Sequence, residues 1–285
     1  RGNNDLYING FNRSTDTIGS YVQFQLPGNV PLKTGNASYY CMMGATSAQT
    51  VSAITEGSQF DQWLTNPGYG NGTGGAPFLK NGTNHADLRF MFDFWGYFRE
   101  GPTTSSDYQT YFYLANKDSS SGNDSVLRFY IMNNGGTPEL RLAFADNTQA
   151  TRGSLNDYVA STSAGAALYP DGLSADGGLH HIALVFDRTN FSNFGTAAGP
   201  DGFYIDGEYH ACNVRTGVSS WYTGAVMEVN VNPILFTQIE GNNPTWTATQ
   251  TSGDPKFNKH FTGKIYHASL SKISSASEIT PSRLK

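Results

Sequence analysis

The sequence predicts an all-β fold in which two antiparallel sheets face each other as a sandwich. Runs of β-branched and aromatic residues recur along the chain, alternate with polar residues and are bounded by Gly, Asn, Asp or Pro, which is typical of strands. Helical spacing of apolar residues is rare. The chain also has 32 Gly and only 14% charged residues, with 13% aromatic ones. This composition suits short strands joined by long loops.

The clearest strand signals fall in segments spread over most of the chain. They are residues 21–26, 88–98, 109–115, 125–132, 139–145, 180–187, 202–205, 208–214, 234–240 and 263–271. Short helices are expected only at residues 58–64 and 275–279, and Gly-rich stretches at 67–75, 164–178 and 194–202 are expected to be loops.

One predicted strand carries three phenylalanines at alternate positions, Phe90, Phe92 and Phe94. Because side chains alternate between the two faces of a strand, these rings share one face and are expected in the core. Met91 and Asp93 point the other way.

The dipeptide Asp206-Gly207 is the sharpest local signal. A two-residue type I′ turn needs positive φ at both positions, and this pair tolerates it. We therefore expect a hairpin in which Ile205 pairs with Glu208.

The whole chain, residues 1–285, is expected to form one domain, with residues 1–80 as a loop-rich elaboration of the same sandwich. The net charge is −5 and there is no basic stripe, so a nucleic-acid partner is not expected. No apolar run has the length of a membrane span, so membrane insertion is not expected either.

Four motifs occur in an order found in one family of folds. They are the strand His-His-Ile-Ala-Leu-Val-Phe-Asp at 180–187, Phe-Tyr-Ile-Asp-Gly at 203–207, Phe-Thr-Gly-Lys-Ile at 261–265 and the Ser…Glu-Ile ending at 275–279. Together they resemble laminin-G-like and concanavalin-A-like lectin domains over residues 85–280. The resemblance implies an antiparallel jelly-roll sandwich. It does not imply one function, because this scaffold carries lectins, adhesion modules, enzymes and virion parts.

Catalysis is not expected. Glucanases of the related fold place acidic residues on one strand as E-x-D-x-x-E or E-x-D-x-E, and no glutamate of this chain begins such a spacing. Jelly-roll lyases use a Gln-Ile-His motif, whereas this chain has Glu240 after Gln238-Ile239.

The candidate metal ligands in this sequence are aspartates. The resemblance implies that calcium, if bound, is held at a loop rim, and Asp187, Asp201 and Asp206 are the candidate donors. The alternative is that these aspartates serve ordinary turn and strand-end chemistry. His180 and His181 are adjacent in a strand, so they point to opposite faces and do not share a zinc ion.

Glycan binding usually combines an exposed aromatic ring with amide groups. Trp221-Tyr222 and Trp246 with Asn242 lie in loop-like sequence and are the candidate ligand-binding residues. The alternative is that each ring anchors its loop on the core.

Cys41 and Cys212 either form a disulfide or remain two free thiols, and the sequence is compatible with both. Six Asn-x-Ser/Thr triplets are candidate glycosylation sites, if the chain is secreted from a eukaryotic cell. They begin at Asn12, Asn36, Asn71, Asn81, Asn123 and Asn190.

These observations favour a non-catalytic extracellular module that recognises a glycan or a cell-surface partner. The second hypothesis is a structural, decoration or host-attachment protein of a virion or extracellular fibre, whose partners include neighbouring subunits. The third is a carbohydrate-active hydrolase or lyase. The expected location is extracellular or on a virion surface.

Overall fold

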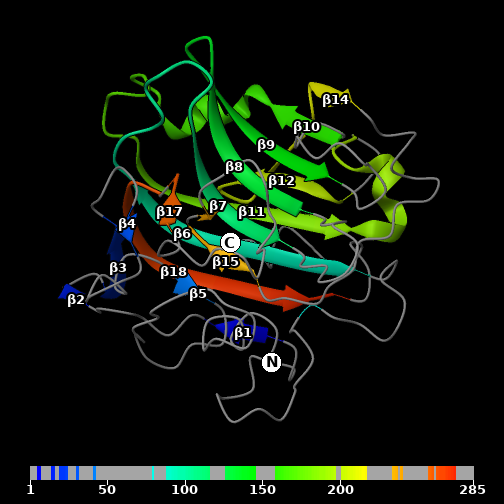
Figure 1. The fold of residues 1–285 in the computed structure, drawn as a ribbon, viewed down its shortest axis with the longest axis horizontal. Coiled ribbons are helices and arrows are strands. Elements are labelled where there is room, and N and C mark those ends of the chain that lie inside the picture. The colour runs from blue at the N-terminus through cyan, green and yellow to red at the C-terminus, as the bar shows by residue number, and fades with distance from the viewer. Residues whose placement is uncertain are drawn as a thin grey trace.

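The computed structural model (Figure 1) describes the backbone of 5–7, 14–16, 19–24, 30–31 and 41–42, and residues 79, 88–115, 126–145, 158–196, 200–216, 233–236, 238–239, 256–259 and 261–273. Its described part is mostly β-strand, arranged in two large antiparallel sheets and one small one. The all-β sandwich predicted from the sequence is confirmed, and the two sheets fit a jelly-roll arrangement.

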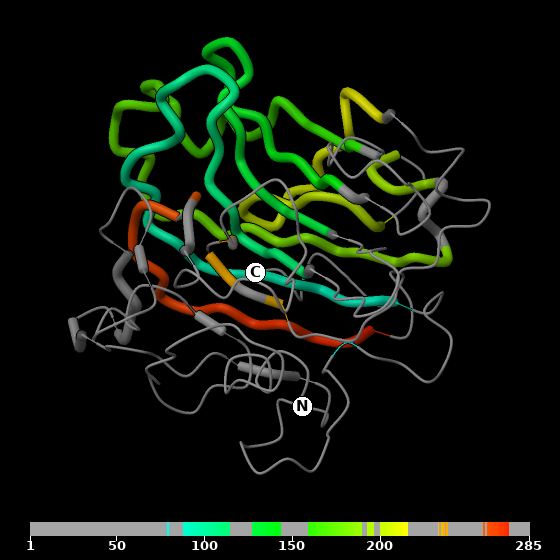
Figure 2. The backbone as a smooth tube through the Cα atoms, viewed as in Figure 1, coloured from blue at the N-terminus to red at the C-terminus, as the bar shows by residue number. Residues whose placement is uncertain are grey.

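The first sheet has eight strands, in the order β13-β12-β11-β6-β18-β3-β2, with β1 also paired to β18. Their bounds are β1 Asp5–Tyr7, β2 Ser14–Asp16, β3 Gly19–Phe24, β6 Arg89–Phe98, β11 Gly178–Asp187, β12 Gly202–Ile205, β13 Glu208–His210 and β18 Gly263–Lys272. Figure 2 shows β18, orange-red, alongside β6, cyan, although the two are far apart in sequence.

The second sheet has seven strands, in the order β14-β10-β9-β8-β7-β15-β5. Their bounds are β5 Cys41–Met42, β7 Tyr108–Ala115, β8 Val126–Asn134, β9 Thr137–Ala145, β10 Tyr158–Thr162, β14 Val214–Thr216 and β15 Ile234–Leu235. The third sheet contains β16 Gln238–Ile239, β17 Lys256–Asn258 and β4 Val30–Pro31. Two 3₁₀ helices are η3 Ser163–Leu168 and η4 Arg188–Asn193.

Aromatic rings from both large sheets fill the space between them. Phe90, Phe92 and Phe94 of β6 are fully buried, as the alternation predicted. Phe112 of β7 stacks on Phe90 with 5.1 Å between ring centroids. Phe129 of β8 also belongs to this fully buried set. Because the rings come from opposite sheets, burying them holds the sandwich together.

The hairpin at β12–β13 forms in the predicted register, with Ile205 opposite Glu208. The φ angles are 52° at Asp206 and 81° at Gly207, the positive values that the turn requires. The backbone N–H of Asp206 also donates to the carbonyl oxygen of His181 at 2.8 Å, and this hydrogen bond holds the turn against β11.

Two predicted strands are broken where the chain leaves one sheet for another. The segment 208–214 ends as β13 at His210, and β14 then begins in the second sheet. The segment 234–240 divides into β15 and β16 at Phe236, which has φ 62° and is 1% exposed. The ring of Phe236 packs 5.1 Å from that of Phe94, so core packing holds the residue in an unusual backbone conformation.

The predicted loop 164–178 was wrong at its start, because η3 occupies Ser163–Leu168. The Thr162 hydroxyl accepts from the N–H of Ala164 at 3.3 Å and caps this helix. A Cβ on Gly165 would lie 2.9 Å from the backbone N of Leu140, so a glycine is needed for the helix to approach β9. The small residues that predicted a loop here instead allow the helix to pack closely against β9.

Other differences concern short strands and the expected helices. The sequence reading missed β1, β2, β4, β5, β10 and β17. The helices expected at 58–64 and 275–279 lie outside the described residues. Among the helices of the described part, none has the length and apolar character needed to cross a membrane.

Candidate functional site

A group of aromatic and polar side chains lies on the outer face of the second sheet, away from the core. Strand alternation puts Phe129 and Ile131 of β8 into the core and turns Arg128 and Tyr130 outward. Thr110 of β7 lies opposite Tyr130 in the sheet register. We call Tyr108, Thr110, Arg128, Tyr130 and Gln238 the tyrosine–arginine cluster.

Arg128 is the centre of this cluster. Its guanidinium carbon lies 4.2 Å from the ring centroid of Tyr108 and 4.2 Å from that of Tyr130. The two rings contact each other edge to face, with 5.4 Å between centroids. These distances are within the range in which a cation is attracted to the face of an aromatic ring.

Gln238, contributed by β16, joins the cluster through its side-chain amide. Its Oε1 accepts from the Thr110 hydroxyl at 3.0 Å and from Nη1 of Arg128 at 3.4 Å. Its Nε2 donates to the Tyr108 hydroxyl at 3.0 Å. One amide thus links three residues from two strands of the second sheet.

The accessible edge of the cluster is formed by Tyr108 with Lys259 and Asp107. The Nζ of Lys259 lies 4.8 Å from the Tyr108 ring centroid and forms an ion pair with Asp107. The side chains of Lys259 and Asp107 are 32% and 39% exposed, whereas Arg128 is only 6% exposed. The cluster therefore runs from a buried guanidinium to a partly exposed tyrosine and ion pair.

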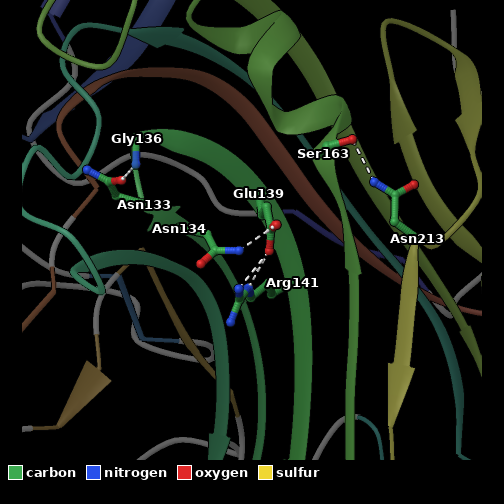
Figure 3. Close-up of polar contacts among 7 residues, drawn as sticks. All are labelled: Asn133, Asn134, Gly136, Glu139, Arg141, Ser163 and Asn213. Carbon is green, nitrogen blue, oxygen red and sulfur yellow. Dashed lines mark hydrogen bonds and ion pairs between the residues drawn. The ribbon is translucent and has the colours of Figure 1, made fainter.

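A second polar group on the same sheet is already paired within the protein (Figure 3). Nε and Nη2 of Arg141 donate to Oε2 of Glu139 at 2.9 and 2.6 Å. Asn134 donates to the other oxygen of Glu139 at 2.9 Å. Figure 3 also shows Asn213, just before β14, donating to the Ser163 hydroxyl at 2.6 Å. These contacts hold neighbouring strands and η3 in place.

The outer face of the first sheet carries a buried His–Asp–Ser group. Oδ1 of Asp93 lies 3.2 Å from Nε2 of His181, and its Oδ2 accepts from the Ser269 hydroxyl. The imidazole packs on Trp95, with 5.1 Å between ring centroids. The carboxylate lies between the hydroxyl and the imidazole. Activation of a serine needs the imidazole between them, so this arrangement is not a nucleophile–base pair.

His180 and His181 point to opposite faces of β11, as predicted. Nδ1 of His180 lies 2.8 Å from Oδ2 of Asp206, and its Nε2 lies 3.0 Å from the carbonyl oxygen of Gly177. His181 instead pairs with Asp93. The two rings therefore do not share a ligand.

The three aspartates proposed as calcium donors are not brought together. Asp187 accepts from the N–H and hydroxyl of Thr189 at 2.9 and 2.6 Å and from Arg89 at 3.2 Å. Asp201 and Asp206 flank opposite ends of β12, about 16 Å apart at the usual rise of a strand. In the described ranges, no group of three or more His, Cys, Asp or Glu could hold a metal ion. Calcium binding remains an untested prediction.

Asp206 has a turn role instead. Its Oδ1 accepts from the backbone N–H of His181 at 2.8 Å, while its Oδ2 meets the His180 ring. These contacts are the ordinary turn chemistry of an aspartate, which bonds the nearby backbone.

Cys212 is a free thiol in this structure, and the side chain of Cys41 lies outside the described residues, so the disulfide stays a prediction. The backbone N–H of Cys212 donates to the carbonyl oxygen of Gly195 at 2.8 Å. Burial raises the pKa of the Cys212 thiol to about 12, and the nearby Arg215 partly opposes that shift.

The remaining sequence candidates lie largely outside the described residues. This holds for the ligand-binding candidates Trp221, Tyr222, Asn242 and Trp246, and for the glycosylation candidates Asn12, Asn36, Asn71, Asn81 and Asn123. Asn190 lies in η4.

The sequence reading missed the tyrosine–arginine cluster. One part of it could be predicted from the sequence. Arg128 and Tyr130 alternate with the apolar Leu127, Phe129 and Ile131, and this alternation indicates an outward polar face. The contact of Gln238 with the cluster could not be predicted from the sequence, because it depends on the break in the strand at Phe236.

Comparison with known proteins adds little to this geometry. No family model matches the chain, and no curated protein matches it. Among solved structures, a match is the leech intramolecular trans-sialidase complexed with 2,7-anhydro-Neu5Ac, with a TM-score of 0.38 and 14% sequence identity. It covers 90% of this chain, and this chain spans 26% of that protein's length.

Proposed function

We propose that this chain is a non-catalytic, extracellular glycan-binding module, and that the tyrosine–arginine cluster is its binding site. The observation that carries the proposal is the meeting of two tyrosine rings, a guanidinium and an amide on one sheet face. The partly exposed ring of Tyr108 can pack on the apolar side of a sugar, while amide and guanidinium groups bond its hydroxyls.

The His–Asp–Ser group supports a binding role over hydrolysis by a serine nucleophile. The Ser269 hydroxyl donates to Asp93, and the His181 imidazole lies on the far side of that carboxylate. His181 is thus not placed to take a proton from Ser269.

Within the described residues, the exposed apolar side chains favour ligand binding over assembly into a particle or fibre. The exposed large hydrophobic side chains in the described part are Leu179 and Val214, on strands of different sheets. Surfaces that assemble usually present a contiguous apolar patch, and two isolated side chains do not form one.

The proposal is tested by screening the chain on a glycan array with three variants. Tyr108→Ala removes the partly exposed ring of the cluster, and we expect it to weaken binding at least about tenfold, equivalent to about 1.4 kcal/mol. Tyr97→Ala is the matched control, because this tyrosine lies on the first sheet and its hydroxyl bonds Asp176 at 2.6 Å. Trp221→Ala tests the alternative location.

Binding that is lost in Tyr108→Ala and kept in Tyr97→Ala would support the proposed site. Binding lost only in Trp221→Ala would place the site elsewhere. If no glycan binds and native mass spectrometry shows a symmetric oligomer, the assembly hypothesis replaces this one.

A further inference from the structure

Among the described residues, no carboxylate pairs with the buried Arg128, in contrast to two other arginines of the chain. Its side-chain contacts are two tyrosine rings and Oε1 of Gln238, and its Nε has no hydrogen-bond partner among the described residues. Arginine stays protonated in proteins, so the buried group keeps its positive charge. A buried charge is costly unless an opposite charge compensates it.

Two other arginines in the described part provide an internal comparison. Arg141 lies on the same sheet and bonds Glu139 through two nitrogens. Arg89 on the first sheet bonds Asp187 at 3.2 Å. Within the described part of the chain, these two arginines therefore have carboxylate partners, whereas Arg128 has a neutral amide.

Hydrogen-bond donors surround the amide of Gln238. The Thr110 hydroxyl and Arg128 donate to its Oε1. The Tyr108 hydroxyl accepts from its Nε2, so the hydroxyl proton can be donated to a ligand. Arg128, Lys259 and Asp107 together carry a net charge of +1. A donor-rich site with one uncompensated positive charge complements an acceptor-only anion.

We propose that the tyrosine–arginine cluster selects acidic sugars, with Arg128 binding the carboxylate of a uronic or sialic acid residue. This inference rests on the proposed glycan-binding function and names its ligand class. A planar carboxylate matches the planar fork of a guanidinium, so the two can form paired hydrogen bonds. The sugar ring then packs at Tyr108, the partly exposed aromatic side chain of the cluster.

Access to Arg128 depends on small side-chain movements. Arg128 is only 6% exposed, so the proposal requires Tyr108 or Gln238 to change rotamer before a carboxylate reaches the guanidinium. Tyr108 lies at the open edge beside Lys259, whose charge attracts an anionic glycan toward the cluster.

The test compares immobilised polygalacturonate and polysialic acid with their methyl esters, which have the same sugars without the negative charge. We expect the free acids to bind at least tenfold more tightly than the esters, and this preference to fall as salt rises. Arg128→Gln should abolish the preference, whereas Arg141→Gln, the matched control on the same sheet, should retain it.

A second variant covers the case in which Arg128→Gln fails to fold. Gln238→Glu keeps the size of the side chain and supplies an internal carboxylate to Arg128. We expect it to remain folded by circular dichroism and to lose acidic-glycan binding at least tenfold.

The outcomes separate the two proposals. Equal binding of acids and esters, or a Gln238→Glu variant that binds the acids as well as the parent, would overturn the acidic-sugar inference and leave glycan binding intact. Failure to bind any glycan, neutral or acidic, would overturn the proposed function itself.

Discussion

Arg128 and Arg141 lie on the same sheet, yet their charges are compensated differently. Arg141 donates two hydrogen bonds to one carboxylate oxygen of Glu139, while Arg128 lies between Tyr108 and Tyr130. A guanidinium between two rings gains cation–π energy, but this does not replace an opposite charge in a buried place. The contrast between these two arginines, within one sheet, is what makes Arg128 informative about a ligand.

At the same scale, Cys212 gives a prediction about pH. Only the thiolate reacts with disulfide reagents, and burial raises the pKa of this thiol from 9.0 to about 12. In a Cys41→Ser variant at pH 8, we expect the folded protein to react with a disulfide reagent at least about tenfold more slowly than the urea-unfolded protein. The folded protein keeps the proton longer, so stability falls as the pH rises from about 9 toward 12.

Cys212→Ala is the control for the predicted pH dependence of stability. Without the thiol, the variant should lose less stability between about pH 9 and 12 than the parent protein. Fast reaction at pH 8 in the folded state would contradict the raised pKa of this thiol. A Cys41–Cys212 cross-link in the non-reduced parent protein would contradict the free thiol.

At the scale of elements, the β12–β13 hairpin gives a prediction about stability. Gly207 has φ 81°, a conformation that costs L-amino acids about 1–2 kcal/mol. We expect Gly207→Ala to lower the free energy of unfolding by about that amount in urea titration. Glu208→Ala, at an exposed position after the same turn, should change it by less than about 0.5 kcal/mol. An unchanged stability in Gly207→Ala would mean that the turn forms differently.

This hairpin and strand β6 show which parts of the fold were predictable. Both depend on local signals: a dipeptide that tolerates positive φ, and phenylalanines with a period of two. The breaks at His210 and Phe236 were not predictable in the same way. The Phe236 backbone is held by contacts with residues far away in the chain, such as Phe94 and the carbonyl oxygen of Tyr111.

The candidate site was less predictable than the fold, for the same reason. Gln238 meets Thr110 and Tyr108 across 128 and 130 residues of sequence. Alternation shows that Arg128 faces outward, but only the strand order shows which side chains surround it. The aspartates proposed for calcium failed to converge because two of them lie at opposite ends of one strand.

At the scale of the whole molecule, the two large sheets share one set of core rings. Phe90 of the first sheet stacks on Phe112 of the second, and Phe203 of the first stacks on Phe129 of the second, with 5.1 and 5.7 Å between centroids. Neither sheet can separate without exposing these rings to water, which costs about 1.5–3 kcal/mol for each fully buried large apolar side chain. We therefore propose that the sheets unfold together.

Hydrogen exchange on Phe112→Ala tests this cooperativity. The substitution lies in the second sheet and should lower stability by about 3–5 kcal/mol, because it removes a buried ring and leaves a cavity. If the sandwich unfolds as one unit, backbone amides of β11 in the first sheet should lose as much protection as those of β8 in the second. Leu179→Ala, at a side chain that is 46% exposed, should leave both unchanged. Loss of protection confined to β7, β8 and β9 would show instead that the second sheet opens independently of the first.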